Sequence, residues 1–105
     1  MANAFKNYAS ASVTTQTTVY TAPSLTQSTV IGMSVANTSA SLATVSVQVT
    51  MGGTTVYLIK NAPVPVGGAM VPVGGDQKVV LEAGDAIKVT SDQTVDVLLS
   101  ALEIS

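Results

Sequence analysis

The feature that most constrains the fold is a strict two-residue alternation of apolar and polar side chains. In the stretch ATVSVQVTM, Val45, Val47, Val49 and Met51 alternate with hydroxyl and amide residues. Alternate residues of a β-strand point to opposite faces, so this pattern predicts an antiparallel strand with one buried and one solvated face. No segment of comparable length has the 3.6-residue period of an amphipathic helix. The chain is therefore expected to be all-β.

The chain is predicted to form a single antiparallel β-sandwich, of jelly-roll or immunoglobulin-like order. Turn-forming residues divide its 105 residues into seven or eight short strand patterns, a spacing typical of sandwiches. Residues 13–105 would form this domain, and residues 1–12 a short N-terminal arm or a short helix, with Phe5 and Tyr8 three residues apart. The predicted core consists of Val45, Val47, Val49, Ile87, Val89, Val97 and Leu99.

Two glycine-containing turns predict hairpins. The pair Gly52-Gly53 separates two strand patterns and supplies the positive φ angles of a tight hairpin, so the strands on either side should pair directly. In KVVLEAGDAIKV, Gly84 would take the left-handed position and the Asp85 side chain would bond backbone amides beyond it. This turn predicts a second hairpin, between residues 78–81 and 86–90.

Two segments have unusual strand faces. STVIGMSVA would place Ile31, Met33 and Val35 on one face and Val30, Gly32, Ser34 and Ala36 on the other. The second face carries small side chains, so it is either a contact surface for another sheet, loop or subunit, or a thinly covered solvent face. TTVYLIK, residues 54–60, is mostly apolar on both faces. It predicts an inner strand or one that is covered by a neighbour.

The stretch VPVGGAMVPVGG, residues 64–75, contains the sequence VPVGG twice within twelve residues. Two copies are too few for an elastin-like tract, and the glycines do not open a helix as they do in a phosphate loop. Proline cannot donate to a β-ladder, so we predict an extended excursion with turns at Gly67-Gly68 and Gly74-Gly75. Its apolar side chains should face another subunit or a shell, unless the segment covers one end of its own sandwich. The candidate interface residues are Val64, Val66, Met70, Val71 and Val73.

Composition limits the possible partners. Charged residues make up 10% of the chain, against about 25% in ordinary soluble domains. The net charge is −2, with four Lys and no Arg, which argues against nucleic-acid binding. Neither a signal-peptide pattern nor an apolar run long enough to span a membrane is present, so no membrane partner is expected. Cys is absent, which removes disulfides and thiolate chemistry.

No catalytic, metal or cofactor site is predicted, and the chain is not expected to be an enzyme. His, Cys and Arg are absent, which excludes imidazole acid–base pairs and nucleophilic triads. Glu82 and Asp85 belong to one turn. They are expected to be a solvated pair and not the two catalytic carboxylates of a glycosidase. Asp92 and Asp96 flank another turn that lacks the oxygen density of a calcium site. Lys60 is expected to protect a sheet edge from wrong pairing.

One inference rests on five segments: MANAFKNY, TTVYTAP, STVIGMSVANTS, YLIKNAPVPVGG and GGDQKVVLEAGDAIKVTSD. As a set, and over nearly the whole chain, they resemble small virion structural proteins of tailed bacteriophages. The resemblance implies a virion component assembled in the cytoplasm of the host bacterium, and specifically a head decoration (cement) protein with major capsid or other virion proteins as partners. A neck, collar or tail-fibre component is the alternative. A small carbohydrate-binding module is less favoured, because one Phe, three Tyr and no Trp offer few rings to stack on sugars.

Self-association is predicted independently of this resemblance. The stretches VYLI and VLL are apolar on both faces and need more cover than one small sandwich gives. Closed cyclic symmetry is the common solution, so a homo-oligomer is expected, with a trimer favoured.

Overall fold

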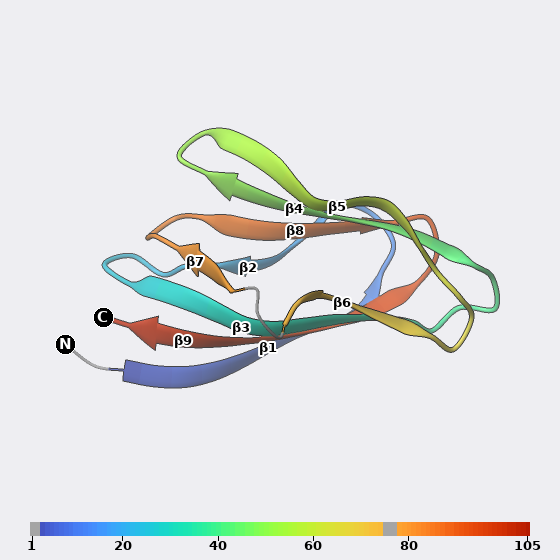
Figure 1. Ribbon diagram of the computed structural model, residues 1–105, viewed down its shortest axis with the longest axis horizontal. Helices are drawn as coiled ribbons and strands as arrows, with labels where there is room; N and C mark the ends of the chain where they lie inside the picture. Colours follow the sequence, from blue (N-terminus) through green and yellow to red (C-terminus); the bar gives the residue numbers. More distant parts are fainter. Residues whose placement is uncertain (1–2, 75–77) are drawn as a thin grey trace.

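Two antiparallel sheets pack face to face in the computed structural model, which describes residues 3–74 and 78–105 (Figure 1). This arrangement confirms the predicted β-sandwich. The five-stranded sheet contains, in spatial order, β1 (Asn3–Val13), β9 (Val95–Ile104), β3 (Gln27–Asn37) and then β6 (Ala69–Val73) and β7 (Val79–Leu81), which both pair with β3. The four-stranded sheet contains, in order, β2 (Thr17–Thr21), β8 (Ala86–Ser91), β4 (Ala43–Met51) and β5 (Thr54–Val64).

The strand pairing is that of a jelly roll. β1 pairs with β9, β2 with β8, β3 with both β6 and β7, and β4 with β5. β6 and β7 share one position beside β3, so they count as one strand position here. The pairs are then nested: the first strand pairs with the last, the second with the next to last, and so on to β4 and β5, which pair with each other. Two sheets of four strand positions in this order are the jelly-roll arrangement. The immunoglobulin-like alternative is wrong, because its sheets do not have this nested order.

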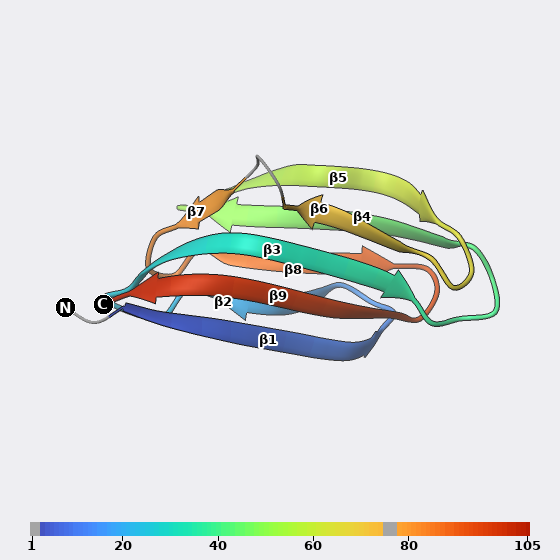
Figure 2. The same ribbon diagram turned by 60° about the horizontal axis from the view of Figure 1, so that its bottom comes forward.

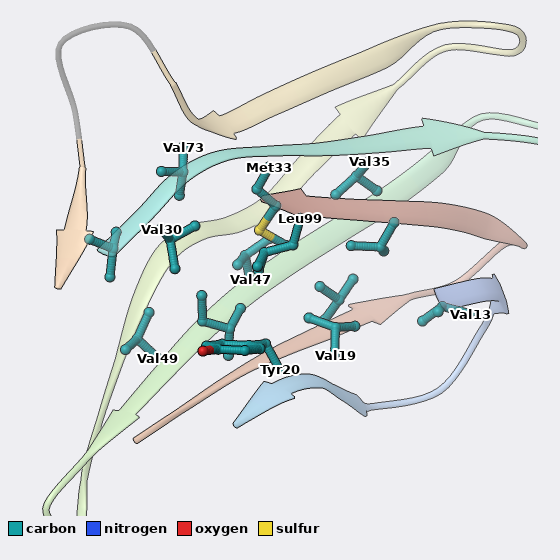
Figure 3. Packing of buried hydrophobic residues seen from close by; sticks show 14 of the residues in the cluster. Val13, Val19, Tyr20, Val30, Met33, Val35, Val47, Val49, Val73 and Leu99 are labelled. Atoms are coloured by element: carbon teal, nitrogen blue, oxygen red, sulfur yellow. The ribbon is translucent and has the colours of Figure 1, made fainter. Parts of the chain in front are cut away.

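The core lies between the sheets and is built largely from valine. All seven residues of the predicted core are buried, as the alternation in β4, β8 and β9 requires. Figure 3 shows valines of both sheets meeting there, with Met33, Leu99 and Tyr20 among them. β-branched side chains suit this interior, because they lose little rotamer freedom on a pleated surface.

The N-terminal segment is a strand of the five-stranded sheet. The helical alternative for residues 1–12 is wrong for the described residues, because Asn3–Val13 forms β1 and pairs with β9. β1 borders the sheet and adds mainly Tyr8 and Val13 to the core. Its inward positions otherwise carry small or polar residues, which explains why the segment lacks an obvious strand pattern.

A register shift in β3 changes which residues are buried. Between Val30 and Gly32 the pairing with β9 slips by one residue, as at a β-bulge. Val30 therefore lies in the core with Met33 and Val35, while Ile31 is exposed. The predicted grouping of Ile31 with Met33 and Val35 is wrong for this reason, because it assumed unbroken alternation.

One of the two predicted hairpins is present. β4 and β5 pair directly across Gly52-Gly53, which have φ angles of 54° and 89°. Residues 82–85 do form a tight turn, in which Asp85 N donates to Glu82 O at 3.0 Å. β7 and β8, however, lie in different sheets, so the predicted hairpin between them is wrong and the turn instead crosses the sandwich.

β5 is an edge strand, and the prediction that it is an inner strand is wrong. It ends the four-stranded sheet next to β4, and its Val56 and Tyr57 are about half exposed. The Nζ of Lys60 lies 5.1 Å from the centre of the Tyr57 ring. The apolar side chains of β5 are therefore only partly covered within one chain.

Candidate association surface

The outer face of the five-stranded sheet carries apolar side chains. Val97 and Leu99 of β9 are buried, so the alternate residues Leu98 and Leu102 point away from the core. Leu98 is 51% exposed, and Phe5 of β1 is 77% exposed. This surface, defined by Phe5, Val80, Leu98, Leu102 and their outward neighbours in the sheet, is called the apolar face below.

The register of the sheet places several of these side chains in one row. Phe5 of β1 lies opposite Leu102 of β9, and Leu102 lies opposite Thr29 of β3. Thr29 in turn lies opposite Val80 of β7, which is 60% exposed. Directly opposite side chains of neighbouring strands lie close together on one face. The row therefore crosses the sheet from one edge to the other.

The apolar face carries little charge. Among the outward positions of the described strands of this sheet, the one ionisable side chain is Asp96. Its Oδ1 accepts a hydrogen bond of 2.9 Å from the backbone N of Ser12. A carboxylate held in this way stabilises the end of β1. The rest of the face has neither the lysines nor the glutamates that usually cover a solvent-exposed sheet.

A shallow hollow lies beside Leu98 on the same face. Small side chains of β1 and β3 line it, among them Ala9, Ser34 and Ala36. Ser34 lies opposite Leu98, and Ala36 opposite Asp96. The small face that the sequence predicted for Gly32, Ser34 and Ala36 is therefore part of the apolar face, next to a protruding leucine. A protrusion beside a hollow is a shape that a partner can fit closely.

The outer face of the four-stranded sheet differs in chemistry. Its outward positions are mostly hydroxyl, amide and lysine side chains, with Tyr57 as the large aromatic exception. This surface is called the polar face below. The hydroxyl, amide and lysine residues at its outward positions include Thr18, Thr44, Ser46, Gln48, Thr50, Thr55, Lys88 and Thr90.

The segment from Val64 to Gly74 divides into buried and exposed parts. Val64 and Val73 lie in the core, with 1% and 0% exposure, and Met70 packs partly against it. Val64 and Val73 fill the interior, so one chain alone accounts for their apolar character and they do not face a partner. Val66 and Val71 are 58% and 66% exposed. The predicted contact with another subunit or a shell is thus kept as a prediction for the exposed Val66 and Val71.

The first predicted turn of this segment is present. Gly67 has a φ of 73°, and Gly68 N donates to Pro65 O at 2.9 Å. Buried Asn37 anchors the segment, because its Nδ2 donates to Val64 O at 2.9 Å. The second predicted turn, Gly74-Gly75, lies partly outside the described residues.

A polar cluster joins the two sheets at one end of the sandwich. Tyr8 Oη donates to Glu103 Oε2 at 2.5 Å, and Tyr20 Oη donates to the same oxygen at 2.8 Å. Since Tyr20 uses its only proton there, its 2.5 Å bond to Ser28 Oγ has the serine as donor. The two rings are 4.7 Å apart and tilted by 53°. β1, β2, β3 and β9 all contribute to this cluster.

The cluster changes how the tyrosines titrate. The hydrogen bond to Glu103, together with burial, raises the pKa of Tyr8 to about 12. Burial is the main cause that raises the pKa of Tyr20 to about 12, and the nearby carboxylate acts in the same direction. Both phenols therefore stay protonated as donors, which suits a structural tie between the sheets.

The three aspartates considered from the sequence, Asp85, Asp92 and Asp96, bind backbone amides. Asp85 Oδ2 accepts from Glu82 N at 3.0 Å, which holds the turn between β7 and β8. This amide precedes Asp85, whereas the sequence predicted one beyond it. Asp92 Oδ1 accepts from Thr44 N at 2.7 Å. Among the residues that the structure describes, no group of three or more potential metal ligands occurs.

Sequence reasoning did not identify the apolar face as a unit. Phe5 belongs to the segment predicted to be an arm or helix, and Val80 to a strand assigned to a hairpin. A signal was present in β9, where Leu98, Leu102 and Ile104 alternate with the buried residues. The neighbours that complete the face come from strands far away in the sequence, so the face follows from the sheet order. Within the described ranges, no helix is long and apolar enough to cross a membrane.

Two solved structures are similar to this chain. Both are crystal structures of a pentameric capsid protein isolated from metagenomic phage sequences, one of them solved by iodide SAD phasing. Each has 26% sequence identity to this chain and covers 92% of it, with TM-scores of 0.45 and 0.44. The chain spans 59% and 60% of the lengths of the matched chains. No protein-family model and no curated protein matches the chain.

Proposed function

We propose that this chain is a non-catalytic structural component of a tailed-phage virion, a head decoration (cement) protein that self-associates and binds the major capsid protein. The observation that carries the proposal is the apolar face. There Phe5, Val80 and Leu98 stand exposed on a sheet whose described strands have Asp96 as their one outward ionisable group. An apolar sheet face rimmed by polar residues is a contact surface for protein. The polar face would remain toward solvent.

The fold and the sequence resemblance support the same proposal. Jelly rolls serve in viral capsid and lectin domains, and the five quoted segments resemble small virion proteins. Fold alone does not determine function, so the choice between these uses depends on the surface. Sugar binding commonly uses exposed aromatic rings, and here Phe5 and Tyr57 lie on different sheets while Tyr8 and Tyr20 face each other inside. This arrangement favours the virion use.

The proposed assembly is a homo-oligomer. The sequence favours three subunits, whereas the strand edges described in the next subsection favour an even number. Burying Phe5 and Leu98 in a contact removes apolar surface that one chain leaves in water. Val66 and Val71 would add to the contact with a subunit or with the shell. A neck, collar or tail-fibre part would use the same physics with another symmetry and a lower copy number.

Copy number in the particle tests the proposal. Quantitative mass spectrometry of purified virions of the encoding phage should give on the order of hundreds of copies for a decoration protein, and a few tens or fewer for a neck or fibre part. The major capsid protein, counted in the same sample, is the internal standard. A few tens of copies would replace the decoration role by the alternative, and absence from purified virions would overturn the proposed function.

A further inference from the structure

The four sheet edges of the sandwich are not equally open to another strand. An edge strand presents unpaired backbone N–H and C=O groups, and proteins commonly block such edges with short strands, prolines, bulges or lysines. The five-stranded sheet ends in β1 on one side and in β6 and β7 on the other, and the four-stranded sheet ends in β2 and β5. Which of these edges is left unblocked indicates where a strand from outside can pair.

Three of the edges carry such devices. β5 has two register shifts against β4, a positive φ of 54° at Asn61, and both Lys60 and Pro63. β6 and β7 are five and three residues long, and β6 contains Pro72. β2 has five residues and a register shift against β8. None of these strands offers a long, regular ladder.

β1 is the longest regular edge. It is eleven residues long and contains no proline or glycine. It carries one lysine, Lys6, and its register shift and the positive φ of 57° at Ser12 come only after Ser10. From Asn3 to Ser10 it pairs with β9 in unbroken register, so this stretch is a regular strand. The backbone hydrogen bonds that the described residues make outside the strand ladders do not involve residues 3–11. Figure 2 shows β1 along the margin of its sheet, next to β9.

We propose that β1 pairs antiparallel with β1 of a second copy of this chain, so that two five-stranded sheets become one continuous ten-stranded sheet. Backbone donors and acceptors of an open edge are satisfied by another strand, and an identical strand can supply them across a twofold axis. The inference rests on the proposed self-association and adds to it a second contact, through the edge of the sheet, beside the burial of the apolar face. An axis perpendicular to the sheet keeps both apolar faces on the same side, where they join into one larger surface.

The sequence of β1 selects a register. Directly opposite residues must share a face, so one residue of β1 lies opposite its own copy and the axis passes midway between the two. An axis at Asn7 pairs all of residues 3–11 and places Phe5 opposite Ala9 and Lys6 opposite Tyr8 of the other copy. An axis at Lys6 would oppose two like charges, which is destabilising. The register centred on Asn7 therefore uses the longest regular stretch without a charge conflict.

Single-cysteine cross-linking tests this register, because the chain contains no Cys. Asn7→Cys would place two sulfurs across the axis, where directly opposite Cβ atoms lie about 4.5–5.5 Å apart, close to disulfide range. Under mild oxidation, a non-reducing gel should show most of this variant as a covalent dimer. Ser100→Cys is the matched control, because Ser100 lies opposite Asn7 in the same outward row but on the inner strand β9. It should remain mostly uncross-linked.

A charge variant provides a second readout. Asn7→Lys would bring two ammonium groups together at the axis and should weaken self-association on the order of 10-fold in sedimentation equilibrium. Ser100→Lys should weaken it less, and both variants should keep the melting temperature of the parent chain.

The outcomes separate the two proposals. If the parent chain sediments as an oligomer but Asn7→Cys does not cross-link, or Ser100→Cys cross-links equally well, the β1 pairing is wrong while self-association stands. A parent chain that forms a trimer and no species with an even subunit number would also contradict the twofold pairing. If the parent chain remains a 10.6 kDa monomer at high concentration, both the pairing and the proposed self-association are overturned. The virion role is tested separately by the copy number.

Discussion

The two outer faces of the sandwich are built on the same strand geometry but differ in chemistry. On the polar face, β4 alternates its buried valines with Thr44, Ser46, Gln48 and Thr50, so that hydroxyl and amide groups meet solvent. On the apolar face, β9 alternates buried residues with Leu98, Leu102 and Ile104, and with the polar Asp96 and Ser100. A two-residue period thus determines which residues enter the core. The outward residues determine which sheet meets water and which meets protein.

Removing two large exposed side chains of the apolar face, Phe5 and Leu98, should have the largest effect. The double variant Phe5→Ser and Leu98→Ser should weaken association by about 3 kcal/mol, on the order of 100-fold, because it removes two large apolar side chains that a partner would bury. Tyr57→Ser, the matched change on the polar face, should leave association nearly unchanged. Sedimentation equilibrium of the three proteins measures both effects. If Tyr57→Ser weakens association equally, the apolar face is not the preferred contact surface.

The interior gives the next largest effect. Val47→Ala should lower the free energy of unfolding by about 1–3 kcal/mol, because it removes buried methyl groups and leaves a cavity. Val47 is fully buried, whereas the next residue, Gln48, points to the polar face. Gln48→Ala should change the stability by less than about 0.5 kcal/mol. Urea denaturation followed by circular dichroism measures both, and a larger loss in Gln48→Ala would contradict the assigned faces.

Much of the interior could be predicted from local alternation, but the partners of each strand could not. Val45, Val47 and Val49 alternate without interruption, so their burial follows from strand geometry alone. The turn at residues 82–85 has the glycine and aspartate that a hairpin needs. The same residues, however, can form a turn that connects strands of two different sheets. Only the long-range pairing of β7 with β3 and of β8 with β4 distinguishes the two.

The candidate surface depends even more on long-range pairing. Phe5 and Val80 are isolated apolar residues in the sequence, and they share a row only because β9 and β3 lie between their strands. Pro63 and Pro72 correctly indicated strands at sheet edges. They did not indicate that the neighbouring Val64 and Val73 point into the core. Proline constrains the backbone and does not specify which face its neighbour takes.

Alkaline pH should affect the tie that holds the two sheets together. The pKa of Tyr8 and of Tyr20 is raised from 10.0 to about 12, so the folded state retains both phenol protons longer than the unfolded chain does. Their contribution to stability is therefore complete below about pH 10 and is lost as pH rises from 10 towards 12. Chemical denaturation across this range should show falling stability.

A matched pair of variants assigns this pH dependence. Tyr8→Phe should flatten the alkaline fall, since one of the two donors to Glu103 is gone. Tyr57→Phe alters a tyrosine on β5, outside the cluster, and should retain the slope. If both variants behave alike, the cluster is not the cause of the alkaline loss.

The smallest effect on stability is expected at the exposed valines of the segment from Val64 to Gly74. The double variant Val66→Ser and Val71→Ser should change the free energy of unfolding by less than about 0.5 kcal/mol, because both side chains are largely exposed. Val73→Ser, the buried control, should lower it by about 2 kcal/mol or more, since it removes core contacts and buries a hydroxyl. If the exposed valines contact a subunit or a shell, the double variant should also weaken oligomer or particle binding at an unchanged melting temperature. A fall in melting temperature with association intact would show that Val66 and Val71 cover one end of their own sandwich.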